Sequence, residues 1–101
     1  MIIERLIQAR QPGTQIQPDM DVEREWDAVE SRAGFPPKKI LRSVAGGLDY
    51  LSIVIEREWD SMAAMEAAYA RVADDPQWQA LVSEAPRYIQ TFRREIYEPL
   101  G

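Results

Sequence analysis

The sequence contains neither cysteine nor histidine among its 101 residues. Without cysteine the chain has no disulfide, no thiol nucleophile and no thiolate metal site. Without histidine it lacks the commonest general base, the commonest metal ligand and the usual ligand of haem iron. A metal site would need oxygen ligands alone, and no cluster of Asp and Glu has the spacing of a calcium-binding loop. We therefore expect a protein without a metal or another cofactor.

The sequence also lacks a long apolar run and a surplus of basic residues. No segment approaches the roughly 20 apolar residues of a membrane-spanning helix, and residues 1–4 do not resemble a signal peptide. Twelve Lys and Arg stand against 17 Asp and Glu, a net charge of −5. This balance argues against nucleic acid, because phosphate binding requires clustered cations. We expect a soluble cytoplasmic protein with neither a membrane nor a nucleic-acid partner.

The chain contains an ordered alternation of strand and helix patterns. Strands are rich in β-branched residues with period-two alternation, and helices begin at capping residues such as Asp75 before Pro76. Gly46 and Gly47 belong to a predicted hairpin turn at residues 46–49. The predicted order is a strand at residues 1–10, a helix at 18–33, strands at 38–45 and 50–59, helices from 60 or 61 to 74 and at 75–85, and a strand at 88–97.

This order predicts an α+β fold, with residues 1–101 forming a single domain. The simplest closure is the ferredoxin-like βαββαβ arrangement, a four-stranded antiparallel sheet with helices on one face. Right-handed crossovers place the first and third strands in the centre of the sheet. Basic residues such as Lys38 and Arg42 then lie on an edge strand, where charge prevents uncontrolled strand addition. The acidic run at residues 19–30 is expected to be the solvated face of the first helix.

Both faces of the predicted sheet carry apolar residues. In the first strand Ile2 and Leu6 alternate with Ile3 and Ile7, whereas a strand with one wet face should be polar at every second position. Stacking two sheets across a twofold axis would cover the second face and stabilise a domain of this size. We therefore predict a homodimer, a dimeric α+β barrel.

Three stretches carry a resemblance to a known family. They are the Pro12-Gly13 turn after the first strand, the strand end EREWDS at residues 56–61, and the helix end ADDPQW at residues 73–78. Together they resemble the NIPSNAP-type branch of the dimeric α+β barrel superfamily. One departure is clear, since family members often carry an Arg-x-Tyr pair in the first strand where this chain has Leu6 and Gln8.

The resemblance implies a homodimer with a pocket in each subunit between the sheet and the helices. Members of the superfamily include cofactor-free monooxygenases, haem-degrading oxygenases, lactone isomerases and ligand-binding proteins, so the fold does not decide the function. Haem degradation is set aside, because haem-binding members usually use a histidine.

Four aromatic residues are candidates for the lining of such a pocket: Trp26, Trp59, Tyr69 and Trp78. One hypothesis is that they enclose a planar apolar molecule. The alternative is that they are ordinary core residues packed between helices and sheet, as aromatic side chains usually are.

Several charged residues lie within predicted strands, where a sheet covered on both faces leaves few wet positions. Arg5 and Arg42 are candidates to hold a carboxylate or an enolate, and Glu56 is a candidate general base with a raised pKa; Arg94 is a further strand arginine. The alternative is that they form ion pairs across the dimer interface or on its rim. Glu4 has the same two alternatives.

Three functions follow from these alternatives. The first is a homodimer that binds a small apolar or aromatic molecule in a pocket between sheet and helices. The second is a cofactor-independent monooxygenase or isomerase that uses Glu56 or a strand arginine. The third is a structural or interaction protein whose own side chains fill the pocket.

Overall fold

The computed structural model describes residues 1–48 and 51–101. The elements follow one another as β1 (Ile2–Arg10), α1 (Met20–Arg32), β2 (Lys39–Arg42), β3 (Ser52–Trp59), α2 (Met62–Ala73), α3 (Pro76–Glu84), a 3-10 turn (Ala85–Arg87) and β4 (Ile89–Tyr97). Within these described residues, no helix has both the length and the apolar character needed to cross a membrane.

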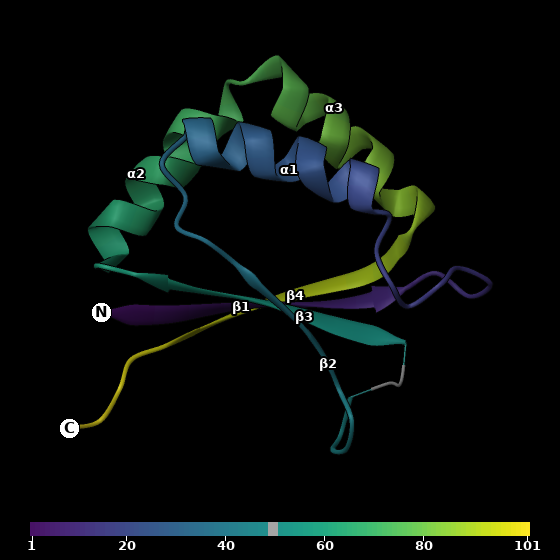
Figure 1. Ribbon diagram of the computed structural model, residues 1–101. Coiled ribbons are helices and arrows are strands. Elements are labelled where there is room, and N and C mark those ends of the chain that lie inside the picture. Colours follow the sequence, from purple (N-terminus) through teal and green to yellow (C-terminus); the bar gives the residue numbers. More distant parts are fainter. Residues whose placement is uncertain (49–50) are drawn as a thin grey trace.

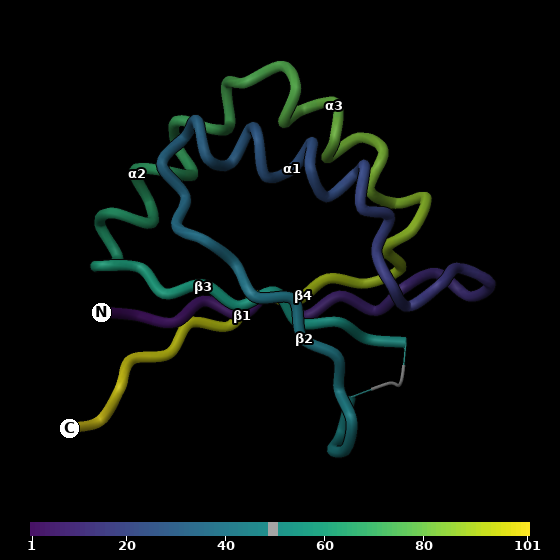
Figure 2. Tube along the Cα trace, in the orientation of Figure 1, coloured from purple at the N-terminus to yellow at the C-terminus, as the bar shows by residue number. Residues whose placement is uncertain are grey.

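The four strands form one antiparallel sheet in the order β2-β3-β1-β4. All three helices form a layer over one face of this sheet, and the other face is left open (Figure 1). The two chain ends lie at the same end of the sheet (Figure 2), since Ile3 of β1 pairs with Tyr97 of β4. The predicted ferredoxin-like α+β fold is confirmed, with β1 and β3 in the centre.

The first helix begins at Met20, two residues later than Pro18 suggested. Asp19 is the N-cap residue, and its carboxylate accepts hydrogen bonds from the backbone N–H groups of Asp21 and Val22 at 2.8 and 3.3 Å. Pro18 precedes the cap and lies outside the helix. The cap satisfies backbone donors that have no partner within the helix.

The later helices begin at the predicted signals. Ser61 caps α2 by accepting a hydrogen bond from the N–H of Ala64 at 3.1 Å. Asp75 caps α3 through the N–H of Gln77 at 2.9 Å, and Pro76 occupies the first turn. Proline suits this position because its missing N–H would have no helical partner there.

The hairpin between β2 and β3 differs from the prediction. β2 ends at Arg42, which pairs with Ile53, whereas a strand to residue 45 was expected. Only Ser52 of β3 remains beyond that pair, because β3 begins there. Residues 44 and 45 therefore have no facing residue in β3, and Val44 is 96% exposed. The expected turn residue Asp49 and strand start Tyr50 lie outside the described residues.

Even-numbered and odd-numbered residues of β1 point to opposite faces of the sheet. Ile2 and Leu6 of β1 are buried toward the helices. Ile7 lies on the open face. It pairs in register with Val54 of β3, and Val54 pairs with Leu41 of β2. The buried core is formed by these residues between the helices and one end of the sheet: Ile2, Val29, Ala33, Phe35, Trp59, Met65, Ala68, Val72 and Leu81.

Candidate functional site

A cavity of about 480 Å³ lies between the helix layer and the sheet. Its floor includes Leu6 of β1, Ile55 of β3 and Phe92 of β4, and its roof includes Trp26 of α1 and Trp78 of α3. The volume is within the range of ligand pockets, about 300–1,000 Å³. The third alternative, in which the protein's own side chains fill the pocket, therefore does not describe this structure.

Aromatic rings make up much of the roof. Trp26 and Trp78 meet edge to face, with ring centroids 5.1 Å apart and planes at 86°. The indole N–H of Trp26 donates a hydrogen bond to the hydroxyl oxygen of Tyr88 at 3.0 Å. Trp26, Tyr69 and Trp78 line the cavity and also pack against the core. The two hypotheses for these rings are therefore not exclusive, since the same residues line the cavity and pack against the core.

Trp59 occupies a different place from the other three predicted pocket residues. It is 3% exposed and is not among the described residues that line this cavity. Its ring packs against Phe35 with centroids 5.1 Å apart, and its indole N–H donates to Oε1 of Glu4 at 3.1 Å. In this structure Trp59 is a core residue that holds a buried carboxylate.

Glu4 lies at the centre of a buried polar network behind the cavity wall, with an exposed fraction of 0%. In addition to the Trp59 bond, its Oε2 accepts a hydrogen bond from the Tyr69 hydroxyl at 2.7 Å and lies 3.2 Å from Nε of Arg94. Burial, together with the bond to Glu4, raises the pKa of Tyr69. Tyr69 therefore remains protonated, and its hydroxyl proton is donated in the hydrogen bond to Glu4.

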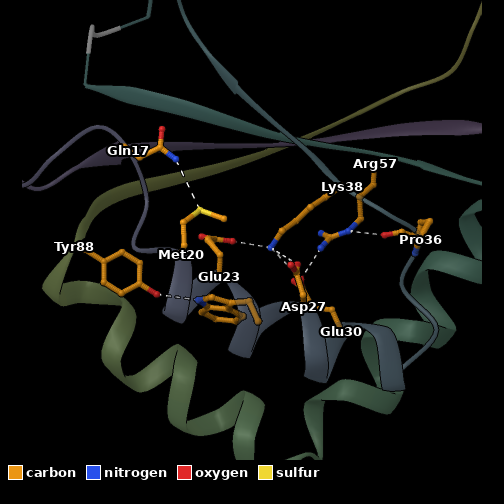
Figure 3. Close-up of polar contacts among 10 residues, drawn as sticks. Gln17, Met20, Glu23, Asp27, Glu30, Pro36, Lys38, Arg57 and Tyr88 are labelled. Carbon is orange, nitrogen blue, oxygen red and sulfur yellow. Dashed lines mark hydrogen bonds and ion pairs between the residues drawn. The ribbon is translucent and has the colours of Figure 1, made fainter.

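A second network brings together residues that the sequence placed on wet surfaces (Figure 3). The ammonium group of Lys38 lies 2.9 Å from Glu23, 3.1 Å from Asp27 and 3.3 Å from Glu30. Lys38, Glu23 and Glu30 have side chains at most 10% exposed, so part of the acidic run is turned inward. Glu23, Asp27 and Glu30 occupy positions i, i+4 and i+7 of α1, which share one helix face. This spacing was the sequence signal from which the cluster could have been predicted.

Arg57 extends this second network from the sheet. Its Nη2 lies 2.7 Å from Oε1 of Glu30, its Nε donates to the carbonyl of Pro36 at 3.2 Å, and its guanidinium lies 5.0 Å from the ring centre of Phe35. Burial raises the pKa of Glu30 despite Arg57 and Lys38. Burial opposes the charge of Lys38, but Glu30 and Glu23 outweigh it and raise the lysine pKa. Lys38 therefore stays an ammonium group and is no nucleophile.

The predicted catalytic residues lie away from the cavity. Nε of Arg5 and Oε1 of Glu56 are 2.9 Å apart on the open face of the sheet, where the two residues are opposed in register. Arg42 is exposed at the end of β2. None of the three is among the described residues that line the cavity. Arg5 and Glu56 thus form an ion pair within the chain. Both their catalytic role and their place at a dimer interface or its rim remain predictions.

Structures of known proteins share this fold. A NIPSNAP domain protein from Burkholderia xenovorans is 18% identical with a TM-score of 0.76, over 100% of this chain and 96% of that chain. A NIPSNAP family protein from Agrobacterium tumefaciens is 20% identical with a TM-score of 0.78, over 99% and 93%. A DABB family protein with a ferredoxin-like fold from Mesorhizobium loti is 20% identical with a TM-score of 0.58, over 99% and 98%.

These identities show a common fold and no more. No curated protein sequence matches the chain. The NIPSNAP family model matches residues 9–101, nearly the whole length, so the chain belongs to the NIPSNAP family.

Proposed function

We propose that this protein binds a small apolar or aromatic molecule in the cavity between its sheet and its helices. The observation that carries the proposal is a cavity of about 480 Å³ whose roof contains Trp26, Tyr69 and Trp78. Apolar pockets with a few placed polar groups are the usual form of small-molecule sites. Edge-to-face indoles offer flat surfaces against which a planar ring packs well.

The test uses the neutral fluorescent probe N-phenyl-1-naphthylamine and two truncations in α3. Trp78→Ala removes a cavity wall and should abolish probe binding. Leu81→Ala removes a core side chain outside the cavity lining, so it should lower the free energy of unfolding by about 2–4 kcal/mol and leave binding intact. The proposal fails if wild-type protein does not bind the probe, or if Trp78→Ala binds it as well as wild type.

A cofactor-independent oxygenase or isomerase is a second candidate, favoured by two carboxylates in the cavity wall. Glu23 and Glu30 line the cavity, and burial raises the pKa of Glu30, as suits a general base. Under this candidate the base is one of these two residues instead of Glu56. Mass spectrometry of a bound ligand before and after aerobic incubation would show a changed mass or isomer, and Glu30→Gln would stop the change.

We also propose that the open face of the sheet packs against a second copy of the chain. Ile7, Val54 and Leu41 form an apolar row across three strands of that face, and Leu41 is 41% exposed. Covering apolar surface stabilises by about 25 cal/mol per Å². The Arg5–Glu56 pair beside the row would then lie within the interface or at its rim. Such a dimer has twice the 11.6 kDa mass of the chain.

A further inference from the structure

Gln8 is a polar residue without an evident structural role. It lies toward the C-terminal end of β1, one of the two central strands, on the face covered by helices, and is 9% exposed. Its register neighbours are the apolar residues Ile53 and Phe92. Its side-chain amide has no hydrogen-bond partner within residues 1–48 and 51–101, although buried amides are almost always paired. The amide atoms themselves are not fully buried, so they can pair with water or with a ligand in the adjoining cavity.

The amide of Gln8 opens into the cavity, because the residue is one of those that line it. Arg94 lines the same cavity from the neighbouring strand β4, opposite Leu6 and therefore on the same face as Gln8. The Nε of Arg94 forms an ion pair with Oε2 of Glu4 at 3.2 Å, and its Nη2 makes only a 3.6 Å contact with the sulfur of Met65. A guanidinium group has five N–H donors, so Arg94 retains donors for a ligand.

The cavity offers these polar groups without a surplus of positive charge. Among the described lining residues, the charged groups are Glu23 and Glu30 against Lys38 and Arg94. Each cation is already paired, Lys38 with α1 carboxylates and Arg94 with the buried Glu4. A carboxylate ligand would lose its hydration without gaining an unpaired cation, which is unfavourable in a site of low polarity.

We propose that the ligand is a neutral planar molecule that carries a carbonyl group beside an N–H or O–H group, such as an aromatic amide or hydroxyketone. Gln8 supplies one amide donor and one carbonyl acceptor, which match a neighbouring acceptor and donor. Arg94 supplies a second donor to the carbonyl, and the aromatic roof packs on the ring. This inference rests on the proposed binding function and names the chemical class of its ligand.

The test compares three probes that share one ring system: naphthalene-2-carboxamide, naphthalene-2-carboxylate and 2-methylnaphthalene. Binding is measured by displacement of N-phenyl-1-naphthylamine and by quenching of tryptophan fluorescence. The amide should bind about tenfold more tightly than 2-methylnaphthalene, as expected for one or two net hydrogen bonds. The carboxylate should bind more weakly than the amide.

Gln8→Met keeps the length of the side chain and removes its amide. We expect the variant to bind the amide no more tightly than 2-methylnaphthalene, while its affinity for 2-methylnaphthalene is unchanged. Gln17→Met is the matched control, because Gln17 is exposed and outside the described cavity lining; it should keep the preference for the amide.

The inference is overturned if wild-type protein binds amide and hydrocarbon equally, if it prefers the carboxylate, or if Gln8→Met keeps the preference. In each case binding of the hydrocarbon would leave the proposed binding function standing. Failure of all neutral probes to bind would instead overturn the proposed function, and this inference with it. The wild-type series decides the matter even if Gln8→Met does not fold.

Discussion

Individual charged residues in the layer between sheet and helices are held by several partners each. Glu4 has Trp59, Tyr69 and Arg94, and Lys38 has three carboxylates of α1. Charged side chains are rarely buried unless they are paired in this way. Removing one partner leaves the others in a medium that solvates charge poorly. Stability should therefore be sensitive to single, nearly isosteric substitutions here.

Glu4→Gln should lower the free energy of unfolding by about 2 kcal/mol, because the amide cannot match the charge of Arg94 or accept from both Trp59 and Tyr69 equally well. Arg94 is partly exposed, which limits the loss. Urea denaturation followed by tryptophan fluorescence measures the effect. Glu25→Gln, on the exposed side of α1, is the control and should be neutral. An unchanged midpoint for Glu4→Gln would contradict a stabilising role of the network.

Tyr69 should make the protein less stable in alkali. Burial and the bond to Glu4 raise its pKa in the folded state above the ordinary value of 10.0. The unfolded chain releases this proton first, so the contribution is complete below pH 10 and is lost as the pH rises above it. Between pH 9 and pH 11, unfolding free energies of wild type should fall more steeply than those of Tyr69→Phe. Equal slopes would show that Tyr69 ionises alike in both states.

At the scale of the elements, the capping residues decide where each helix begins. Asp75 separates α2 from α3, since it ends the loop after α2 and satisfies the first turn of α3. It also accepts a hydrogen bond from Arg32 of α1 at 3.1 Å. One side chain thus begins a helix and links it to a neighbouring one.

Asp75→Ala should cost about 1 kcal/mol of stability, the usual value for loss of an N-cap. The exposed ion pair with Arg32 adds little to that value. Thermal unfolding measured by circular dichroism reports the change. Asp74→Ala is a matched control, since Asp74 lies next in the chain but caps no helix start. If both substitutions lower the melting temperature equally, the cap is not the cause.

For the whole molecule, alternate residues of each strand point to opposite faces of the sheet, and a different proposed function belongs to each face. Even-numbered residues of β1, such as Glu4 and Gln8, face the helices and the cavity. Odd-numbered residues, such as Arg5 and Ile7, face away from them. One face therefore serves the proposed ligand site, and the other serves the proposed contact between subunits.

Val54→Arg should convert a homodimer into a monomer, because it places a charge in the apolar row of the open face. Val44→Arg makes the same chemical change at a fully exposed position outside the sheet and should leave the dimer intact. Native mass spectrometry or sedimentation measures both. A wild-type protein that is monomeric at micromolar concentration would contradict the proposed contact.

Much of the architecture was determined by the sequence alone, because its signals are local. Asp19, Ser61 and Asp75 accept hydrogen bonds from backbone N–H groups two or three residues away. The strands are recognised by alternation of residue types over a few positions. The order of strands then follows from the handedness of short crossovers. The strand-order and helix predictions therefore hold, while the length of β2 depended on where its partner strand begins.

Only the tertiary structure decided the site, because its contacts join residues far apart in the chain. Trp59, Tyr69 and Arg94 meet Glu4 from 55, 65 and 90 positions away. The same packing turned part of an acidic helix face inward onto Lys38. It also placed Arg5 and Glu56 on the face opposite the cavity. Alternation shows that a strand has two faces, but the packing of the helices determines which one they cover.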